Sequence, residues 1–223
     1  MAGRVAGKVA LVTGGAMGLG KADCETLARE GAKVIVTDRD AELAHQVAAE
    51  IGGDAMALDV TSEDQWIEVM RAVQERHGGL DILVNNAGMV SSRSIEQAEM
   101  EAWGRVIGVN LTGTMLGCRV AIAAMKRNPG GASGAIVNIA STTAIAPLPT
   151  DVGYSASKAG VRAISKSVAT WCAQQGLAIR CNTVIPGATD TGILSQAEKV
   201  TPGLKQAVAA TSPRWPPKAG LCW

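Results

Sequence analysis

The sequence contains no phenylalanine and only one tyrosine, Tyr154, among its 223 residues. Hydrophobic residues nevertheless make up 47% of the chain, which is enough for a sizeable core built without aromatic rings of that size. The length suits one large domain, and we expect this domain to span residues 1–208, with an atypical tail over 209–223. Because the lone phenol stands in the small-residue run DVGYSASKAG (151–160), it calls for an explanation other than core filling.

The chain has no large excess of charge of either sign, and it has few histidines. Lys plus Arg (21) nearly balances Asp plus Glu (20), so no basic field for nucleic acid or an anionic membrane is expected. Only His45 and His77 are present, and both stand in polar helical stretches where we expect them to face solvent. The sequence therefore predicts neither a metal site nor a Ser-His-Asp triad.

The five cysteines are scattered and form no CxxC pair, which is typical of small buried residues in a reducing cytosol. We therefore expect a cytoplasmic protein. The apolar run near the N-terminus is too short for a signal sequence, and no stretch is expected to reach the roughly 18 apolar residues of a membrane helix.

Continuous apolar runs alternate with longer helical patterns along the chain. This alternation predicts an α/β fold with a doubly wound, Rossmann-like parallel sheet, whose continuous strands are buried on both faces. Ser62 and Gln65 are expected to form a capping box at one helix start. The expected strands are 8–13, 33–37, 54–58, 81–84, 135–140 and 178–185, and the expected helices are about 18–30, 40–51, 62–77, 98–127 and 154–175.

The segment TGGAMGLG (13–20) lies between the first expected strand and the first expected helix. Gly14 permits a tight turn, Gly18 lets the backbone approach a pyrophosphate, and Gly20 lets the helix pack on the sheet. We expect this loop, including Met17 and Leu19, to bind a dinucleotide. A merely structural glycine turn is the alternative.

Acidic residues follow the second and third expected strands. Asp38 is placed to accept both ribose hydroxyls of an adenosine and to repel the extra phosphate of NADP, which favours NAD. Arg39 beside it is a possible phosphate partner, and Asp38 is alternatively a helix-capping acid. Asp59, followed by Val60, is placed to bind the adenine amino group or simply to start a turn.

Tyr154 and Lys158 stand four residues apart, so they share one helix face. A neighbouring ammonium favours the phenolate and lowers the pKa of a tyrosine, which suits the phenol to exchange a proton with an alcohol. Ser141 follows a strand, where its hydroxyl can bind a carbonyl oxygen, with Thr142 and Thr143 as rivals. The alternative is a surface tyrosine beside a surface lysine.

With these motifs in order, the chain resembles the short-chain dehydrogenase/reductase family over about residues 5–195. The resemblance rests on TGxxxGxG at 13–20, Asp59-Val60, NNAG at 85–88, Asn110 in GVNLTG, Ser141, YxxxK at 154–158, and Pro186-Gly187 with Thr191.

The resemblance implies an NAD-dependent enzyme acting on a secondary alcohol or ketone. Tyr154 would be its acid/base, Lys158 would hold the nicotinamide ribose, and Ser141 would orient the substrate oxygen. Asn110 would hold a proton-relaying water. The cofactor would be lined by Asn86, Ala87, Gly88, Pro186, Gly187 and Thr191, in addition to the glycine loop, Asp38, Arg39, Asp59 and Val60.

Three stretches, DQWIEVMRAVQ, GCRVAIAAMK and QQGLAIRCN, are similar to those of bacterial NAD-dependent hydroxysteroid dehydrogenases. Met89, Thr143, Leu148, Val152 and Ile193 would then form an apolar pocket for a cyclic or steroid-like substrate. The family also implies a homodimer through helices 98–127 and 154–175. A non-catalytic or truncated dinucleotide-binding protein is the alternative.

The tail departs from the family pattern, in which a helix and a final strand are expected. Residues 209–223 contain Pro213, Pro216 and Pro217, which neither a helix nor a central strand tolerates. We therefore expect the last strand to be missing and the sixth strand to be an exposed apolar edge. We also expect a dimer at most, less stable than full-length relatives, with weak or no activity.

Overall fold

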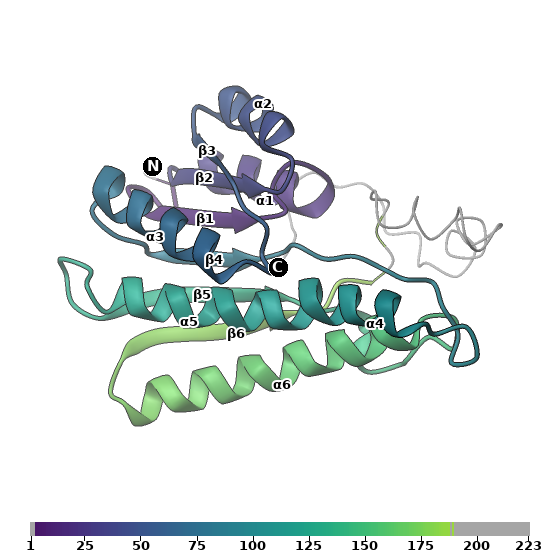
Figure 1. The fold of residues 1–223 in the computed structure, drawn as a ribbon. Coiled ribbons are helices and arrows are strands. Elements are labelled where there is room, and N and C mark those ends of the chain that lie inside the picture. Colours follow the sequence, from purple (N-terminus) through teal and green to yellow (C-terminus); the bar gives the residue numbers. More distant parts are fainter. Residues whose placement is uncertain (1–2, 188, 190–223) are drawn as a thin grey trace.

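Figure 1 shows the computed structural model, which describes residues 3–187 and 189. In this part of the chain six strands form one parallel sheet in the order β3-β2-β1-β4-β5-β6. The order reverses between β1 and β4, so the chain has the doubly wound fold predicted from the sequence. The strands are β1 (Val9–Thr13), β2 (Lys33–Asp38), β3 (Asp54–Ala57), β4 (Ile82–Asn85), β5 (Ser133–Ile139) and β6 (Ala178–Val184).

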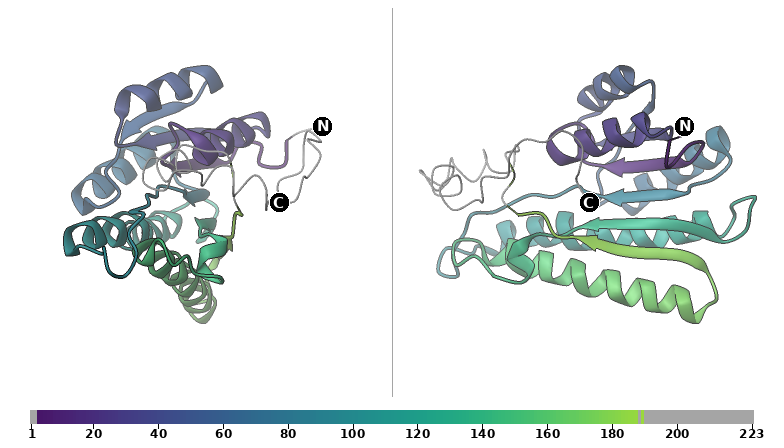
Figure 2. Two further views of the ribbon diagram at one scale, coloured as in Figure 1. Left: turned by 90° about the vertical axis from the view of Figure 1, so that its right-hand side faces the viewer. Right: turned by 180° about the vertical axis from the view of Figure 1, so that it is seen from behind.

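Helices follow the strands and pack on both faces of the sheet (Figures 1 and 2). Helices α3, α5 and α6 pack on one face, whereas α1 and α2 pack over β1, β2 and β3 on the other. Along β1, Leu11 belongs to the first layer of core residues and Val12 to the second, as the alternation of a strand requires. The helices are α1 (Gly18–Arg29), α2 (Ala41–Ile51), α3 (Glu63–His77), α4 (Met100–Ile107), α5 (Gly113–Met125) and α6 (Val152–Gln174).

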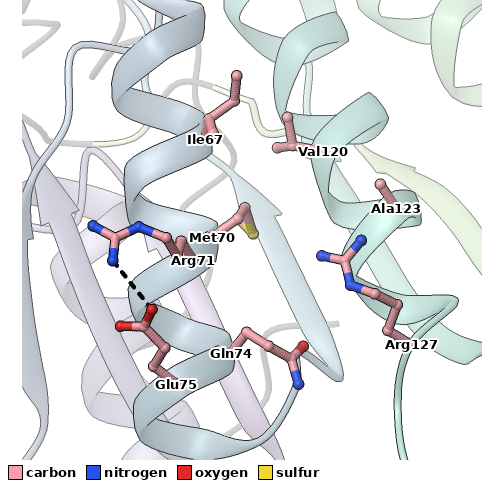
Figure 3. Close-up of a pocket in the computed structure, with 8 residues that line it drawn as sticks. All are labelled: Ile67, Met70, Arg71, Gln74, Glu75, Val120, Ala123 and Arg127. Carbon is pink, nitrogen blue, oxygen red and sulfur yellow. Dashed lines mark hydrogen bonds and ion pairs between the residues drawn. The ribbon is translucent and has the colours of Figure 1, made fainter.

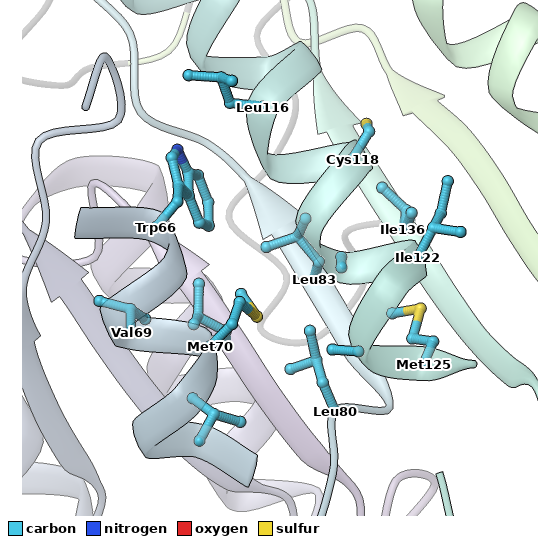
Figure 4. Close-up of a cluster of buried hydrophobic side chains, with 14 of the residues drawn as sticks. Trp66, Val69, Met70, Leu80, Leu83, Leu116, Cys118, Ile122, Met125 and Ile136 are labelled. Atoms are coloured by element: carbon cyan, nitrogen blue, oxygen red, sulfur yellow. The ribbon is translucent and has the colours of Figure 1, made fainter. Parts of the chain in front are cut away.

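The larger core layer is built from aliphatic side chains around one tryptophan. Trp66 of α3 is fully buried against α5 and β4, with Leu83 and Leu116 nearby (Figure 4). Its indole N–H donates to the Val60 carbonyl at 3.0 Å, so the ring's one polar atom is satisfied. The core is therefore filled by aliphatic side chains and one tryptophan, without any phenylalanine.

The single helix predicted over 98–127 is interrupted. A π-helical segment, η1 (Gly108–Thr112), separates α4 from α5. It carries Asn110, whose side chain is fully buried and bonded to the backbone of Met89. A hydrophobic pattern does not report a tertiary contact of this kind, and π-segments of this type often mark functional sites.

The run Met100–Met125 is long and apolar enough to cross a membrane by length and composition alone, with a hydropathy of 1.5. The sequence prediction that no stretch reaches this threshold was therefore wrong. In the fold, α5 packs on β4 and β5, and 44% of the apolar window is buried inside the protein. These contacts describe a core helix.

Two local predictions were also wrong. Ser62 caps α3 by accepting from Gln65 N at 3.3 Å, but the Gln65 side chain accepts from Asp59 N instead of closing a capping box. The side chain of His77, expected to face solvent, is only 14% exposed and lies 2.8 Å from Asp54. The buried-cysteine prediction holds for Cys24, Cys118, Cys172 and Cys181.

Strand β6 differs from the continuous burial expected of it. Ile179 and Cys181 are buried, whereas Arg180 and Asn182 between them are exposed. One face of β6 packs on α6, and among residues 3–187 no helix packs on the other. The predicted domain end at 208 and the tail 209–223 lie outside the described residues.

Candidate active site

The glycine turn after β1 is locked to the end of β4. The Thr13 hydroxyl accepts from Asn86 N and Ala87 N, both at 3.0 Å, and Asn86 Nδ2 donates to the carbonyls of Thr13 and Gly14 at 3.0 Å. Gly14 has φ +63°, and a Cβ there would lie 2.9 Å from Ala87 Cα. Where the strand order reverses between β1 and β4, the glycine turn is therefore packed closely against the backbone that follows β4.

Helix α1 begins at this turn with its backbone N–H groups uncapped by any side chain. Its N-cap residue Met17 makes no capping bond, and the first turn carries no acidic residue. Met17 and Gly18 are exposed, Leu19 is half-buried, and a Cβ on Gly20 would lie 2.1 Å from the Gly14 carbonyl oxygen. A helix start of this kind suits an anionic ligand, because the free N–H groups and the positive dipole end face outward.

Asp38 lies at the end of β2, beside the glycine turn. Its carboxylate accepts from Ala16 N at 3.3 Å and from Asp40 N at 3.1 Å. The cap of α2 is Asp40, which accepts from Leu43 N at 3.1 Å. The helix-capping alternative for Asp38 is therefore wrong. Arg39 is exposed.

The acid after β3 has a local structural role. Asp59 is exposed, and its carboxylate accepts from the Thr61 backbone N–H at 2.9 Å and from the Thr61 hydroxyl at 2.7 Å. This is the turn-starting alternative considered from the sequence. Val60 is buried, and a Cβ on Gly113 would meet its side chain at 2.8 Å, so it packs against the start of α5.

The reactive residues gather at the carboxyl edge of the sheet. Ser141 follows β5, is buried, and caps the short 3₁₀ turn η2 (Thr142–Ala144) by accepting from Thr143 N. Lys158 on α6 is buried, and its ammonium donates to the Ile139 carbonyl at 2.7 Å. The ammonium nitrogen lies 5.7 Å from the centroid of the Tyr154 ring.

Burial dominates the protonation of these groups. It raises the pKa of the Tyr154 phenol, a hydrogen bond with Ser141 acts in the opposite direction, and the charge of Asp151 raises that pKa further. The pKa of Tyr154 is therefore raised, and the lowering expected from Lys158 is not found. Burial lowers the pKa of Lys158 to about 8, since its charged form lacks water around it.

Asn110 joins the loop after β4 to α6. Its side chain exchanges two hydrogen bonds with the Met89 backbone, at 2.8 and 2.9 Å, and donates to Ser157 Oγ at 3.0 Å. The Ser157 hydroxyl donates in turn to the Tyr154 carbonyl at 2.7 Å. A Cβ on Gly88 would lie 3.4 Å from Lys158 Nζ, so this loop passes directly over the reactive residues.

The chain after β6 reaches the same edge. The Pro186 carbonyl accepts from Thr142 N at 3.0 Å, beside Ser141, and Gly187 follows on the surface. Thr191 and Ile193 lie outside the described residues. The predicted site residues that follow β1, β2, β4, β5 and β6 and lie within the described part of the chain share one edge of the sheet.

The family follows from comparison with known proteins. A family model described as short chain dehydrogenase matches residues 8–201. The chain belongs to the short-chain dehydrogenase family.

Two relatives of this short-chain dehydrogenase differ in what their names state. The 3-beta-hydroxysteroid dehydrogenase of Comamonas testosteroni is 42% identical over 196 residues, which cover 87% of this chain and 76% of the relative. The NADP-dependent (R)-specific alcohol dehydrogenase of Lentilactobacillus kefiri is 39% identical over 202 residues, covering 89% and 79%. The family thus includes alcohol and hydroxysteroid dehydrogenases, and at this level of identity it does not fix the choice between NAD and NADP.

A similar fold occurs in a crystal structure titled ribose-5-phosphate isomerase from Brucella melitensis 16M. It has a TM-score of 0.80 and 35% identity, with 87% of this chain and 74% of that chain covered. Because one fold hosts different activities, the function of this short-chain dehydrogenase has to be argued from its own site.

One residue of the site was missed by sequence reasoning. Asp151, three residues before Tyr154, is only 3% exposed and accepts from Tyr154 N at 3.0 Å. An acid directly before a helix is an available sequence signal for a cap. Its other partners, Ser91 and Ser92, lie about sixty residues earlier in the chain and leave no local signal.

A surface cavity of about 380 Å³ lies away from these residues, between α3 and α5 (Figure 3). Met70, Val120 and Ala123 form part of its lining, and Arg71 pairs with Glu75 at 3.1 Å on its rim. It contains none of the predicted site residues of this short-chain dehydrogenase.

Proposed function

We propose that this short-chain dehydrogenase transfers a hydride between NAD(H) and a secondary alcohol or ketone, with Tyr154 as the acid/base. The observation that carries the proposal is the meeting of Tyr154, Lys158 and Ser141 at the sheet edge to which the uncapped start of α1 also belongs. The bound nicotinamide would supply the hydride chemistry, since it accepts or donates the two electrons.

The residues around the glycine turn fit a dinucleotide. The start of α1 offers N–H groups to a pyrophosphate, and the glycine turn leaves no room for a Cβ at Gly14 or Gly20. Asp38 offers a carboxylate to the adenosine ribose. We assign Met17, Leu19, Asp59, Val60, Asn86, Ala87, Gly88, Pro186, Gly187 and Thr191 to the same cofactor site on the family resemblance.

Proton transfer is assigned to this chain's own groups. During alcohol oxidation the Tyr154 phenolate would take the hydroxyl proton, and during ketone reduction the neutral phenol would donate it. The Ser141 hydroxyl would donate a hydrogen bond to the substrate oxygen. Lys158 would hold the cofactor ribose, and Asn110 would position the water that connects Lys158 to solvent.

We favour NAD over NADP because a carboxylate at the Asp38 position repels a ribose phosphate. Asp38 is held against the glycine turn by Ala16 N, and the capping task that would otherwise occupy it belongs to Asp40. The exposed Arg39 is the residue that would favour NADP, because it could pair with the ribose phosphate. One relative is NADP-dependent, so binding of NAD and of NADP should be compared directly.

A cyclic or steroid-like alcohol is the substrate class that we favour. Met89, Thr143, Leu148 and Val152 lie in segments that flank Ser141 and Tyr154, and none carries a charge that would anchor an anionic substrate. The hydroxysteroid relative supports this class. We also propose a homodimer through the helices at 98–127 and 154–175. A cytoplasmic location remains a prediction.

The test is turnover of the purified chain and of its Tyr154→Phe variant, with NAD at alkaline pH and a panel that includes a cyclic alcohol and a 3β-hydroxysteroid. We expect the variant to lose about 10²- to 10⁴-fold in kcat, because the proton acceptor is gone. Affinity for NADH should stay within a few-fold, as measured by fluorescence titration.

Substantial turnover by Tyr154→Phe would contradict the assignment of Tyr154 as the acid/base. A parent chain that binds NADH but oxidises nothing in the panel would favour the alternative of a non-catalytic dinucleotide-binding protein.

A further inference from the structure

Only two charged residues are buried in the described part of the chain, and both lie on or beside the helix that carries Tyr154. Asp151 caps α6 three residues before Tyr154, and Lys158 follows four residues after it. The family resemblance gives Lys158 a role. It gives none to Asp151.

The Asp151 carboxylate accepts four hydrogen bonds. One oxygen accepts from Ser91 N at 2.8 Å and Ser92 N at 2.7 Å. The other accepts from the Ser91 hydroxyl at 2.6 Å and from Tyr154 N at 3.0 Å. Three of the four donors therefore belong to the loop after β4, and one belongs to the first turn of α6.

The loop held in this way has a backbone that depends on its contacts. Ser92 has φ +52°, a left-handed conformation that a serine adopts at some cost. One end of the loop is fixed at Met89 by Asn110, and the other by Asp151, with a backbone bond from Val152 N to Arg93 O at 3.2 Å. The segment 89–93 is thereby attached at one end to the π-segment and at the other to the start of α6.

Capping alone does not explain this residue. A serine or asparagine would satisfy Tyr154 N equally well, without the cost of burying a charge. A buried carboxylate is tolerated when donors surround it, and here the loop supplies most of them. The choice of a carboxylate therefore serves the loop.

We propose that Asp151 is a positioning residue that fixes the loop 89–93 against the Tyr154 end of α6 and so sets how the alcohol substrate is held. The inference rests on the proposed function. It assigns the loop, through Ser91 and Ser92, to the wall of the substrate site, because the preceding Gly88 already lies against Lys158 and Asn110.

The deciding variant is Asp151→Ser, which keeps a capping oxygen for Tyr154 N but is too short to hold the loop. We expect kcat/KM for the alcohol to fall at least tenfold, mainly through KM, while the dissociation constant for NADH stays within twofold. The matched control is Ser62→Ala, which removes the cap of α3 away from the loop and should leave the KM for the alcohol unchanged. An unchanged KM for Asp151→Ser would overturn the proposal.

Should Asp151→Ser fail to fold, Ser91→Ala removes only the hydroxyl donor and should raise KM several-fold with normal NADH affinity. A wild-type KM for Ser91→Ala would then overturn the proposal. The two hypotheses separate cleanly. Turnover by Tyr154→Phe contradicts the proposed function, whereas an inactive Tyr154→Phe with a normal Asp151→Ser contradicts only this inference.

Discussion

At the scale of single residues, burial shifts the pKa values of an acid, Tyr154, and a base, Lys158, in opposite directions. The pKa of Tyr154 is raised and that of Lys158 is lowered, in each case mainly by loss of water around the charged form. In the proposed mechanism the neutral phenol donates its proton during ketone reduction. Alcohol oxidation needs the phenolate and should therefore become faster as pH rises.

Lys158→Met should stabilise the fold at neutral pH while removing activity. Burial lowers the pKa of Lys158 from 10.5 to about 8, so between these values the unfolded chain binds a proton that the folded chain does not. The stability of the parent therefore rises with pH across this window, and the variant's advantage, at most roughly 3 kcal/mol below pH 8, shrinks. Part of the gain is offset by the lost bond to the Ile139 carbonyl.

Urea unfolding of both proteins at pH 7 and pH 9.5 checks this prediction. Lys166→Met is the matched control, because Lys166 is an exposed lysine on the same helix and should give no such gain. If Lys158→Met is less stable than the parent at pH 7, the hydrogen bond outweighs the buried charge.

Asp38→Ala should raise the dissociation constant for NAD about tenfold or more and reduce discrimination against NADP. The physical reason is the loss of a carboxylate that accepts ribose hydroxyls and repels a phosphate. Asp40→Ala is the control. It removes the cap of α2 at a cost of about 1 kcal/mol, and the NAD/NADP ratio should not change. A parent chain that already prefers NADP would show that Arg39 outranks Asp38.

Residues with local signals were predictable, whereas residues with distant partners were not. The glycine turn, Ser141 and the Tyr154–Lys158 pair follow from spacing and from their place after strands, and the structure brings them to one edge of the sheet. Asp151 was missed because three of its four bonds go to Ser91 and Ser92. The pKa direction of Tyr154 was missed because it depends on burial, which no motif reports.

At the scale of elements, apolar runs predicted all six strands of the described sheet to within one or two residues. The predictions failed where a tertiary contact overrides a periodic pattern. The helix predicted over 98–127 is interrupted at η1 because Asn110 turns inward to meet Met89. Ser62 caps α3 as predicted, but the capping box is incomplete because the Gln65 side chain accepts from the backbone of Asp59 and not from that of Ser62. The interruption at η1 lets Asn110 connect the loop after β4 to α6, through Met89 and Ser157.

At the scale of the whole molecule, the two faces of the sheet are not covered alike. Helices α3, α5 and α6 pack on one face, whereas α1 and α2 pack over β1, β2 and β3 on the other (Figure 2). At the β6 end of the described sheet, Arg180 and Asn182 are exposed between buried neighbours. Strand β6 is thus less apolar than the sequence suggested, and polar side chains of this kind oppose pairing of a strand with another chain.

The outer surface of α6 is the place where a second copy is predicted to bind. Ala156, Ala159 and Ala163 are exposed along this helix, and Met115 is exposed on the neighbouring α5. Small side chains let two helices approach closely, and in a twofold dimer a substitution occurs on both sides at once. We therefore expect Ala159→Arg to give a monomer in sedimentation velocity runs under conditions where the parent is a dimer. Ala49→Arg, the same change at an exposed alanine of α2, should leave the dimer intact. A dimer that survives Ala159→Arg, or is lost only with Ala49→Arg, would place the interface elsewhere on the molecule.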